Sequence, residues 1–357
     1  YWSGGVELVD AHSPPQPGAI NSQPATTPGT GTDAATLAPA STSPAPVLTV
    51  ARHQPPANGL DWSLLRLKVQ DVWQKAGTRG KGIKVAVLDT SLFDGHQEID
   101  NANIIARKNF TQGEAHVTTD KVGHGSFCTG LIAAQGKALF GVAPEVSLLI
   151  GKVTNFHHKV KEGPLLKGIE WACEQGADII SISLFLDVVS DAFKQKVKSL
   201  IQTNKVLIVA ASGNDGDVGL DIDRFPASLP NCLSVGASNH DDKIAAFSTR
   251  TQRVNLFVPG TKLTSLGTKD KDEYKLDSGT SMSTAVMSGI IAVLMSAAQQ
   301  KGQNFSPRRW IEMISTNAQQ FVTFPHQSFP NYVPLDKPFP LVDPLRTLQS
   351  IQHAPIT

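Results

Sequence analysis

Five short runs of apolar, often β-branched residues recur along the chain, and none of them alternates with polar residues. They are IKVAVL (83–88), VSLLIGKV (146–153), ADIISISL (177–184), KVLIVAAS (205–212) and CLSVGAS (232–238). A strand covered on one face alternates apolar and polar residues, so these runs predict strands buried on both faces. Such strands belong to largely parallel sheets, which narrows the fold more than any other feature of the sequence.

Segments with apolar residues three or four positions apart separate these runs, at 125–135, 163–175 and 190–204. Repeated strand–helix–strand units connect through right-handed crossovers. They predict an α/β fold of three layers, with a mostly parallel, twisted β-sheet and helices on both faces. Ser306-Pro307 and Asp343-Pro344 each offer an N-cap followed by proline, which predicts two further helices. In such folds, functional groups gather at the carboxyl ends of the strands.

Residues 1–58 differ in composition from the rest of the chain. They are rich in Pro, Ser, Thr, Ala and Gly and have almost no aromatic content after Trp2. Such a segment cannot bury enough apolar surface to offset its ordering entropy. We therefore expect a disordered linker or tail over 1–58 and one folded domain over 59–357. Pro/Ser/Thr-rich stalks favour a secreted or extracytoplasmic location, but this composition leaves a cytoplasmic one open.

Charge and cysteine content exclude several classes of function. The chain has 32 basic and 31 acidic residues, which gives no indication of nucleic acid or an anionic membrane as a partner. We expect no apolar run of the roughly 18–20 residues that span a bilayer, and no signal peptide in residues 1–20. Cys128, Cys173 and Cys232 lack CxxC spacing, so they are expected to be core residues rather than a metal cluster.

Three polar residues stand where apolar runs end or begin. Asp89 follows the first predicted strand, His124 lies between two glycines before an apolar helix, and Ser281 follows Gly279-Thr280 before another. Each has a structural alternative: a turn or cap carboxylate, a structural histidine, and a helix-capping serine. A serine hydroxyl becomes a nucleophile when an imidazole accepts its proton and a carboxylate holds that imidazole. Together, the three residues predict nucleophilic catalysis at one edge of the sheet.

Asn214 adds a fourth candidate, in the turn SGNDG after the strand at 205–212. A side-chain amide at this edge can donate a hydrogen bond to the oxyanion of an acyl-transfer reaction. The structural alternative is a turn asparagine that tolerates left-handed geometry.

These motifs resemble those of the subtilisin-like serine proteases, or subtilases, over about residues 61–352. The similar segments are VAVLDTS, HGSFCTG, SGNDG and SGTSMSTAVMSG, with the flanking GVAP, GIEWA and VPG. The resemblance implies that Asp89 orients the imidazole, His124 is the general base and Ser281 attacks the peptide carbonyl. It also implies that Asn214 and the Ser281 N–H bind the oxyanion.

The resemblance further implies a substrate pocket walled by Ser183, Leu184 and Phe185, with Gly213 and Asp215 beside it. Phe185 and Leu186 are bulkier than the family's usual residues, and are expected to narrow or reshape the subsites. The Asp215 carboxylate is expected either to favour a basic substrate side chain or to be a solvated loop charge.

The chain departs from the usual family motifs at Ser91, Phe127 and Ala285, none of which replaces a triad member. The loop at 135–141 is short and offers one side-chain oxygen, from Gln135. Calcium needs several oxygen ligands, so we expect that the family's calcium site at this loop is absent. The expectation is therefore no cofactor, with a weaker calcium site elsewhere as the alternative. Residues 1–58 are too polar to form the family's folding-assistant propeptide.

These observations favour a serine endopeptidase that hydrolyses a polypeptide substrate through an acyl-enzyme intermediate. A transamidase or macrocyclase with the same triad is a first alternative, because an amine can replace water in resolving the acyl-enzyme. A non-catalytic binding module with a subtilase fold is a second. A removed propeptide or a tethered neighbouring domain are further expected partners.

Overall fold

The computed structural model describes residues 52–111, 119–155, 160–321 and 339–354. Residues Arg52–Thr357 form one compact unit. Most of the expected linker, residues 1–51, lies outside the described residues. Residues 52–58, also assigned to the linker by their composition, are part of the compact unit, where His53 pairs with Tyr274 in an isolated bridge. The folded unit therefore begins earlier than the sequence predicts.

Within the described residues, a nine-stranded sheet forms the middle layer, in the order β10-β11-β7-β6-β5-β4-β1-β3-β2. Its strands are β1 (Lys84–Asp89), β2 (Ile104–Asn109), β3 (Ser147–Lys152), β4 (Ile179–Ile182), β5 (Leu207–Ala211), β6 (Cys232–Ser238), β7 (Leu256–Pro259), β10 (Gln319–Phe321) and β11 (Phe339–Leu341). Every neighbouring pair is parallel except β10 and β11. The five predicted strands are β1, β3, β4, β5 and β6, so the predicted α/β class is confirmed. Strands β8 (Leu263–Leu266) and β9 (Tyr274–Asp277) form a separate antiparallel pair.

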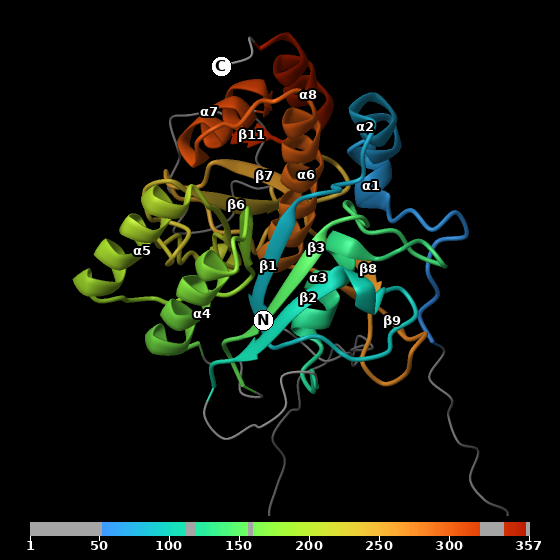
Figure 1. The fold of residues 1–357 in the computed structure, drawn as a ribbon, viewed down its shortest axis with the longest axis horizontal. Helices are drawn as coiled ribbons and strands as arrows, with labels where there is room; N and C mark the ends of the chain where they lie inside the picture. The colour runs from blue at the N-terminus through green and yellow to red at the C-terminus, as the bar shows by residue number, and fades with distance from the viewer. Residues whose placement is uncertain (1–51, 112–118, 156–159, 322–338, 355–357) are drawn as a thin grey trace, which may run out of the picture. The chain divides into compact units, whose positions relative to one another are not determined.

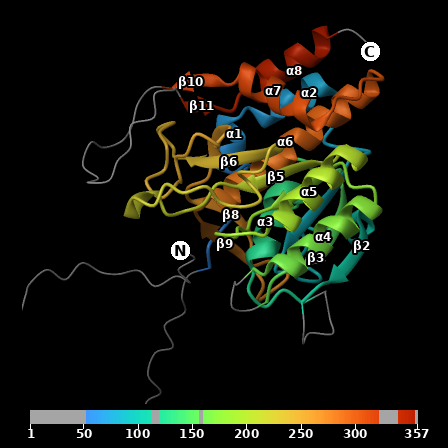
Figure 2. The same cartoon turned by 90° about the vertical axis from the view of Figure 1, so that its left-hand side faces the viewer.

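Helices cover both faces of the sheet (Figure 1). They are α1 (Trp62–Arg66), α2 (Val69–Ala76), α3 (His124–Ala133), α4 (Glu162–Glu174), α5 (Asp191–Asn204), α6 (Thr280–Gln300), α7 (Pro307–Asn317) and α8 (Pro344–His353), with the 3-10 turns η1 (Asn101–Asn103) and η2 (Gly216–Val218). Successive strand residues face opposite sides. Val85 and Val87 of β1 pack in a core with α2, α3 and α6, whereas Ala86 and Leu88 pack in a second core with α4 and α5. Figure 2 shows the same layers from the side.

Helix α6 passes through the larger core, and all of Thr280–Ala298 is buried. Its 21 residues are long and apolar enough to cross a membrane by length and composition. The expectation that no apolar segment reaches this length is therefore wrong for residues 280–300. The whole apolar window is buried inside the fold, as in the core helix of a globular domain.

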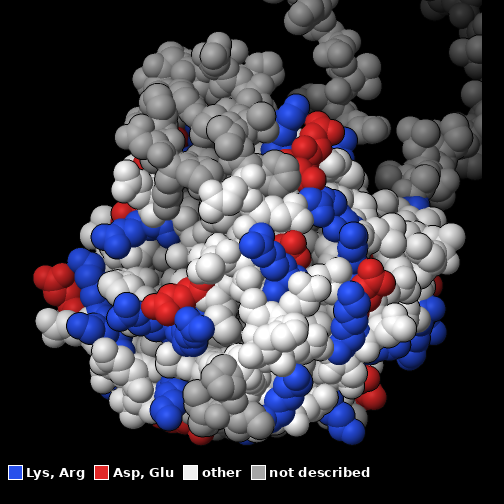
Figure 3. Space-filling view, turned by 90° about the horizontal axis from the view of Figure 1, so that it is seen from above, with Lys and Arg blue, Asp and Glu red and all other residues white. Residues whose placement is uncertain are grey.

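The two predicted proline-led helices are α7 and α8. The side chain of Ser306 accepts a hydrogen bond from the Arg309 N–H, and that of Asp343 accepts one from the Arg346 N–H. On the face shown in Figure 3, Lys and Arg side chains are interspersed with Asp and Glu. This mixture agrees with the net charge of +1.

Candidate active site

The candidate residues meet at the carboxyl edge of the sheet, around the strand where its order reverses. β3 and β2 lie on one side of β1, and β4 to β7 lie on the other. Ligand sites in open parallel sheets form at such reversals. Asp89 is the last residue of β1, while Ser183 follows β4 and Asn214 follows β5.

Asp89 and His124 are in direct contact, with His124 Nδ1 2.8 Å from Asp89 Oδ1. An Nδ1–H that donates to this carboxylate leaves Nε2 as the proton acceptor, which a general base requires. Asp89 is 1% exposed, and its Oδ2 has no hydrogen-bond partner among the described residues. The carboxylate is therefore buried away from water, in a region of low dielectric constant where its charge acts strongly on the imidazole.

The pKa of His124 reflects two opposing effects. Burial disfavours the charged imidazolium and lowers the pKa. The charge of Asp89, the hydrogen bond to it, and the weaker charges of Asp277 and Asp120 together outweigh burial. The pKa of His124 therefore lies above the usual 6.5. This makes the imidazole a stronger base than a free histidine.

The loop before His124 is organised by Asp120, a residue that the sequence analysis missed. Asp120 is 2% exposed and accepts hydrogen bonds from the Thr90 hydroxyl, the Gly123 N–H, and both the N–H and hydroxyl of Ser126. It thus ties the end of β1 to the start of α3, which sets the distance between Asp89 and His124. Its position four residues before His124 was the available signal.

Ser281 is the second residue of α6 and is 8% exposed. Its hydroxyl donates to the Ser183 carbonyl at 2.9 Å, and the Ser183 hydroxyl donates to the Ser281 carbonyl at 2.8 Å. Asp89 and His124 are thus paired, whereas the Ser281 hydroxyl faces Ser183 instead of the imidazole. Nucleophile–base hydrogen bonds often tighten only in the substrate complex, and a rotation about the Cα–Cβ bond of Ser281 would redirect its hydroxyl.

Cys128 lies one turn after His124 and is fully buried. Burial and the charge of Asp89 raise the pKa of its thiol well above the usual value, so it stays protonated. The donor atoms of Asp89, His124 and Cys128 all lie within 4.8 Å of one another. Two of these atoms, Asp89 Oδ1 and His124 Nδ1, are already engaged in the hydrogen bond to each other. All three cysteines are free and buried, which confirms their prediction as core residues.

Asn214 is oriented by Thr280, because its Oδ1 accepts from the Thr280 N–H at 2.9 Å and from the Thr280 hydroxyl at 2.8 Å. Its Nδ2 is left to face Gly279. A Cβ atom built on Gly279 would lie 3.5 Å from Asn214 Nδ2 and 3.7 Å from Ser281 N. Two donors therefore flank one point beside the nucleophile, an arrangement that can stabilise an oxyanion.

The predicted substrate-binding residues lie on the two loops that follow β4 and β5. Ser183 and Leu184 are buried, and Phe185 lies under the Arg224 guanidinium, 4.7 Å from the ring centroid. Gly213 has a φ of 114°, which favours glycine.

Asp215 Oδ2 accepts a hydrogen bond from Arg224 Nη2 at 2.6 Å. The Asp215 charge is thus already paired, which argues against recognition of a basic substrate side chain. Arg224 could not be predicted from the sequence, because no motif connects it with these two loops.

The fold accepts the three residues that differ from the usual family motifs, Ala285, Phe127 and Ser91. Ala285 is fully buried, and α6 continues through it without interruption. Phe127 is 2% exposed and packs in the larger core. Ser91 adopts a φ of 111°, and its buried hydroxyl has no partner among the described residues.

The loop at 135–141 does not fit a calcium ion. The N–H groups of Lys137, Ala138 and Leu139 donate to the Glu98 carboxylate at 2.6–3.0 Å. Glu98 is fully buried and also accepts from the Tyr274 hydroxyl. Calcium needs oxygen ligands, whereas this loop turns donors inward, toward a carboxylate that is already engaged.

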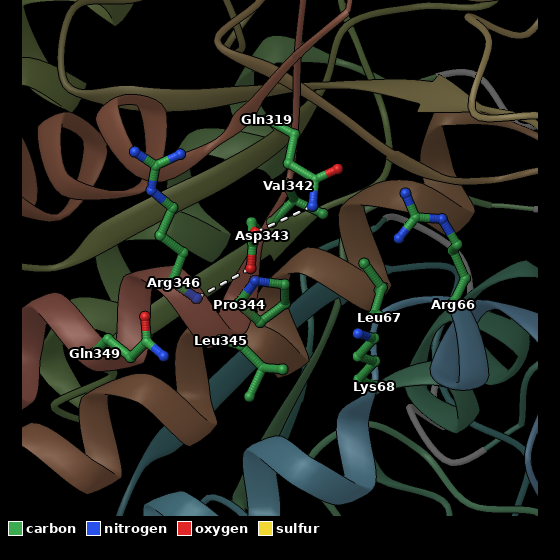
Figure 4. A pocket seen from close by; sticks show the side chains of 10 residues that line it. All are labelled: Arg66, Leu67, Lys68, Gln319, Val342, Asp343, Pro344, Leu345, Arg346 and Gln349. Carbon is green, nitrogen blue, oxygen red and sulfur yellow. Dashed lines mark hydrogen bonds between the residues drawn. The ribbon is translucent and has the colours of Figure 1, made fainter.

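A cavity of about 330 Å³ lies elsewhere, between the α1–α2 junction and the start of α8. Figure 4 shows Lys68 and Arg346 among its side chains, and Asp343 bound to Gln319 and to the Arg346 N–H. None of the predicted site residues lines it, so it is separate from the candidate active site.

Comparisons with known proteins agree with this geometry. The model of the Subtilase family matches residues 80–331. The major intracellular serine protease of Bacillus subtilis is 35% identical over 254 residues, which cover 69% of this chain and 78% of that protein. The minor extracellular protease Epr of the same species is 32% identical over 235 residues, which cover 65% of this chain and 35% of Epr.

A solved structure, that of the prenylagaramide maturation protease PagA, superposes with a TM-score of 0.66 at 26% identity. The match covers 79% of this chain and 98% of PagA. These relatives include proteins named intracellular and extracellular, so the similarity does not assign a compartment. The family match and the curated relatives agree with the motifs at the sheet edge. This chain belongs to the subtilase family.

Proposed function

We propose that the chain is a serine endopeptidase in which Asp89, His124 and Ser281 form the catalytic triad. The observation that carries the proposal is the 2.8 Å contact between His124 Nδ1 and Asp89 Oδ1 at the sheet edge where α6 begins. The family assignment supports the reaction class, and the substrate is a polypeptide.

In the proposed mechanism, the Ser281 hydroxyl rotates from Ser183 to His124. His124 Nε2 takes the hydroxyl proton while Oγ attacks the peptide carbonyl carbon. The negative charge on the carbonyl oxygen is stabilised by Asn214 Nδ2 and the Ser281 N–H. His124 then gives its proton to the leaving amine, and a water molecule, deprotonated by His124, releases the acyl group from Ser281.

We propose that this reaction needs no metal or other cofactor. The inward-facing N–H groups at 137–139 support this for the calcium site expected at that loop. The composition of residues 1–58 favours an extracytoplasmic location, which fractionation of cells that express the protein would test.

The test is labelling with a fluorophosphonate followed by peptide hydrolysis. We expect an adduct on Ser281 and hydrolysed peptide products. Ser281→Ala should lower kcat by roughly a million-fold, a magnitude known from subtilisin, a relative of this chain. The same change should cost no more than about 1.5 kcal/mol of unfolding free energy, because it removes one hydrogen bond.

Product masses separate the alternatives. Cyclic or ligated peptides in place of hydrolysed ones would assign the chain as a transamidase. A folded protein that forms no adduct and cleaves no peptide would make it a binding module.

A further inference from the structure

A buried arginine connects the two loops that carry the predicted substrate-binding residues. The Arg224 side chain is 7% exposed, and it forms ion pairs with Asp187 and Asp215. Asp187 belongs to the loop after β4, and Asp215 to the loop after β5. One guanidinium group therefore bridges two loops that leave adjacent strands of the sheet.

The same two loops meet the nucleophile with their first residues. Ser183, after β4, exchanges two hydrogen bonds with Ser281. Asn214, after β5, holds Thr280. In the proposed reaction, a substrate carbonyl at Ser281 and Asn214 would place the adjacent side chain beside these two loops, which carry the residues expected to form the substrate pocket. Arg224 bridges the loops a few residues farther along, so it limits the depth of that space.

Contacts of the arginine with both walls restrict its movement. Its guanidinium lies over the Phe185 ring on one wall. On the other, a Cβ built on Gly213 would lie 3.1 Å from Arg224 Cγ. The main chain adds a second connection, because Leu186 and Phe225 exchange N–H to carbonyl hydrogen bonds of 2.9 and 3.0 Å. The arginine is thus held by a stacked ring, two carboxylates and a backbone bridge.

We propose that Arg224, clamped between Asp187 and Asp215, closes the pocket beside Ser281, so that the enzyme cleaves after small residues such as Gly, Ala and Ser. This inference rests on the proposed endopeptidase function. A large side chain would have to displace a paired, buried guanidinium, and breaking such a pair is costly. A basic side chain would meet the guanidinium, and an acidic one would meet two carboxylates. Both the size and the charge of the site therefore favour a small, uncharged side chain before the cut bond.

The test measures kcat/KM for one peptide series in which only the residue before the cut bond varies: Gly, Ala, Ser, Leu, Phe, Lys and Glu. With the full chain, we expect the three small residues to exceed the other four at least tenfold. Equal cleavage after Leu or Phe would overturn the proposal, and so would a preference for Glu, which would assign Arg224 as an anion receptor. This wild-type profile decides the question without any variant.

Two variants test whether the preference for small residues comes from the clamp, that is, Arg224 with its ion pairs to Asp187 and Asp215. Arg224→Ala should raise kcat/KM for Phe relative to Ala at least tenfold. Should it fail to fold, Asp187→Asn, at a side chain that is 67% exposed, should still shift the ratio in the same direction. Arg66→Ala is the control, because Arg66 also forms an arginine–aspartate ion pair, with Asp242, and neither residue belongs to these two loops. It should leave the profile unchanged, and an unchanged profile in both clamp variants would contradict the role of Arg224.

Fluorophosphonate labelling separates the two possible failures. An adduct on Ser281 together with cleavage after large residues contradicts the pocket proposal and leaves the endopeptidase function intact. An adduct without cleavage of any peptide also contradicts it, because small residues should be accepted. Absence of both adduct and cleavage contradicts the proposed function itself.

Discussion

Ser91 occupies a backbone conformation that residues with a side chain rarely adopt. Its φ is 111°, and its hydroxyl is buried without a partner among the described residues. Ser91→Gly should relieve the backbone strain and remove the unpaired hydroxyl, at an entropic cost of about 0.5–1 kcal/mol. We expect a net gain of about 1–2 kcal/mol in unfolding free energy, measured by chemical denaturation. Ser91→Ala is the control, because it removes the hydroxyl but keeps the Cβ atom. Equal gains from both variants would contradict the strain at this residue.

Protonation of His124, whose pKa is raised by Asp89, should cause the loss of activity at low pH. Because its pKa lies above 6.5, kcat/KM should fall as the pH drops through a midpoint above that value. In the folded protein the imidazolium is favoured, so its contribution to stability is complete below the unfolded-state pKa and is lost as the pH rises through the folded-state pKa.

NMR titration of the His124 ring in the Ser281→Ala protein checks this assignment. Asp89→Asn should lower the pKa strongly, because only the weaker fields of Asp277 and Asp120 then oppose the effect of burial. Asp277→Asn should lower it less, since Asp277 contributes a weaker field. An unchanged pKa in Asp89→Asn would contradict the assignment of its partner.

At the scale of elements, α3 approaches β1 so closely that only glycine fits between them. A Cβ built on Gly125 would lie 2.2 Å from the Ser91 carbonyl oxygen. Gly125→Ala should therefore push α3 away, cost about 1–3 kcal/mol of stability, and lower kcat/KM about 100-fold by displacing His124. Gly163→Ala in α4 is the control, because a Cβ there meets nothing within 4 Å. It should leave activity unchanged, and equal effects of both changes would argue against the close approach.

The elements also show what the sequence can predict. Asp89, His124, Asn214 and Ser281 were found because each stands at the end of a strand or the start of a helix, a local signal. Arg224 was missed because its partners, in the loops after β4 and β5, are close only in the folded chain. β2 was missed for another reason: its residues are half-buried or exposed, so they give no continuous apolar run. Patterns along the chain thus predict positions on the sheet edge, but not the side-chain pairs across it.

At the scale of the whole molecule, Glu98 connects segments far apart in the chain. It follows β1, binds the loop after α3, and accepts a hydrogen bond from Tyr274 in β9. Glu98→Gln should cost about 2–3 kcal/mol, because an amide group replaces a carboxylate that faces several donors. Glu145→Gln, at an exposed carboxylate, should change stability by less than about 0.5 kcal/mol.

The hydrogen bonds between Glu98 and the loop after α3 also predict how the protein responds to chelators. Thermal unfolding in EDTA should give the same Tm as unfolding in calcium, to within about 1 °C, because the loop at 135–141 turns N–H donors toward the Glu98 carboxylate and does not offer calcium the oxygen ligands that it needs. A lower Tm in EDTA that calcium restores would show that an ion stabilises the fold.

The burial of α6 has a consequence for the fate of damaged molecules. The helix that presents Ser281 is also the segment of the described chain whose composition a lipid bilayer would accept. Unfolding separates Ser281 from His124 and, in the same event, exposes this segment to other unfolded chains and to lipid. A denatured molecule should therefore lose its proteolytic activity and become prone to aggregation in the same step. Heat-inactivated protease should precipitate and should not degrade other protein molecules.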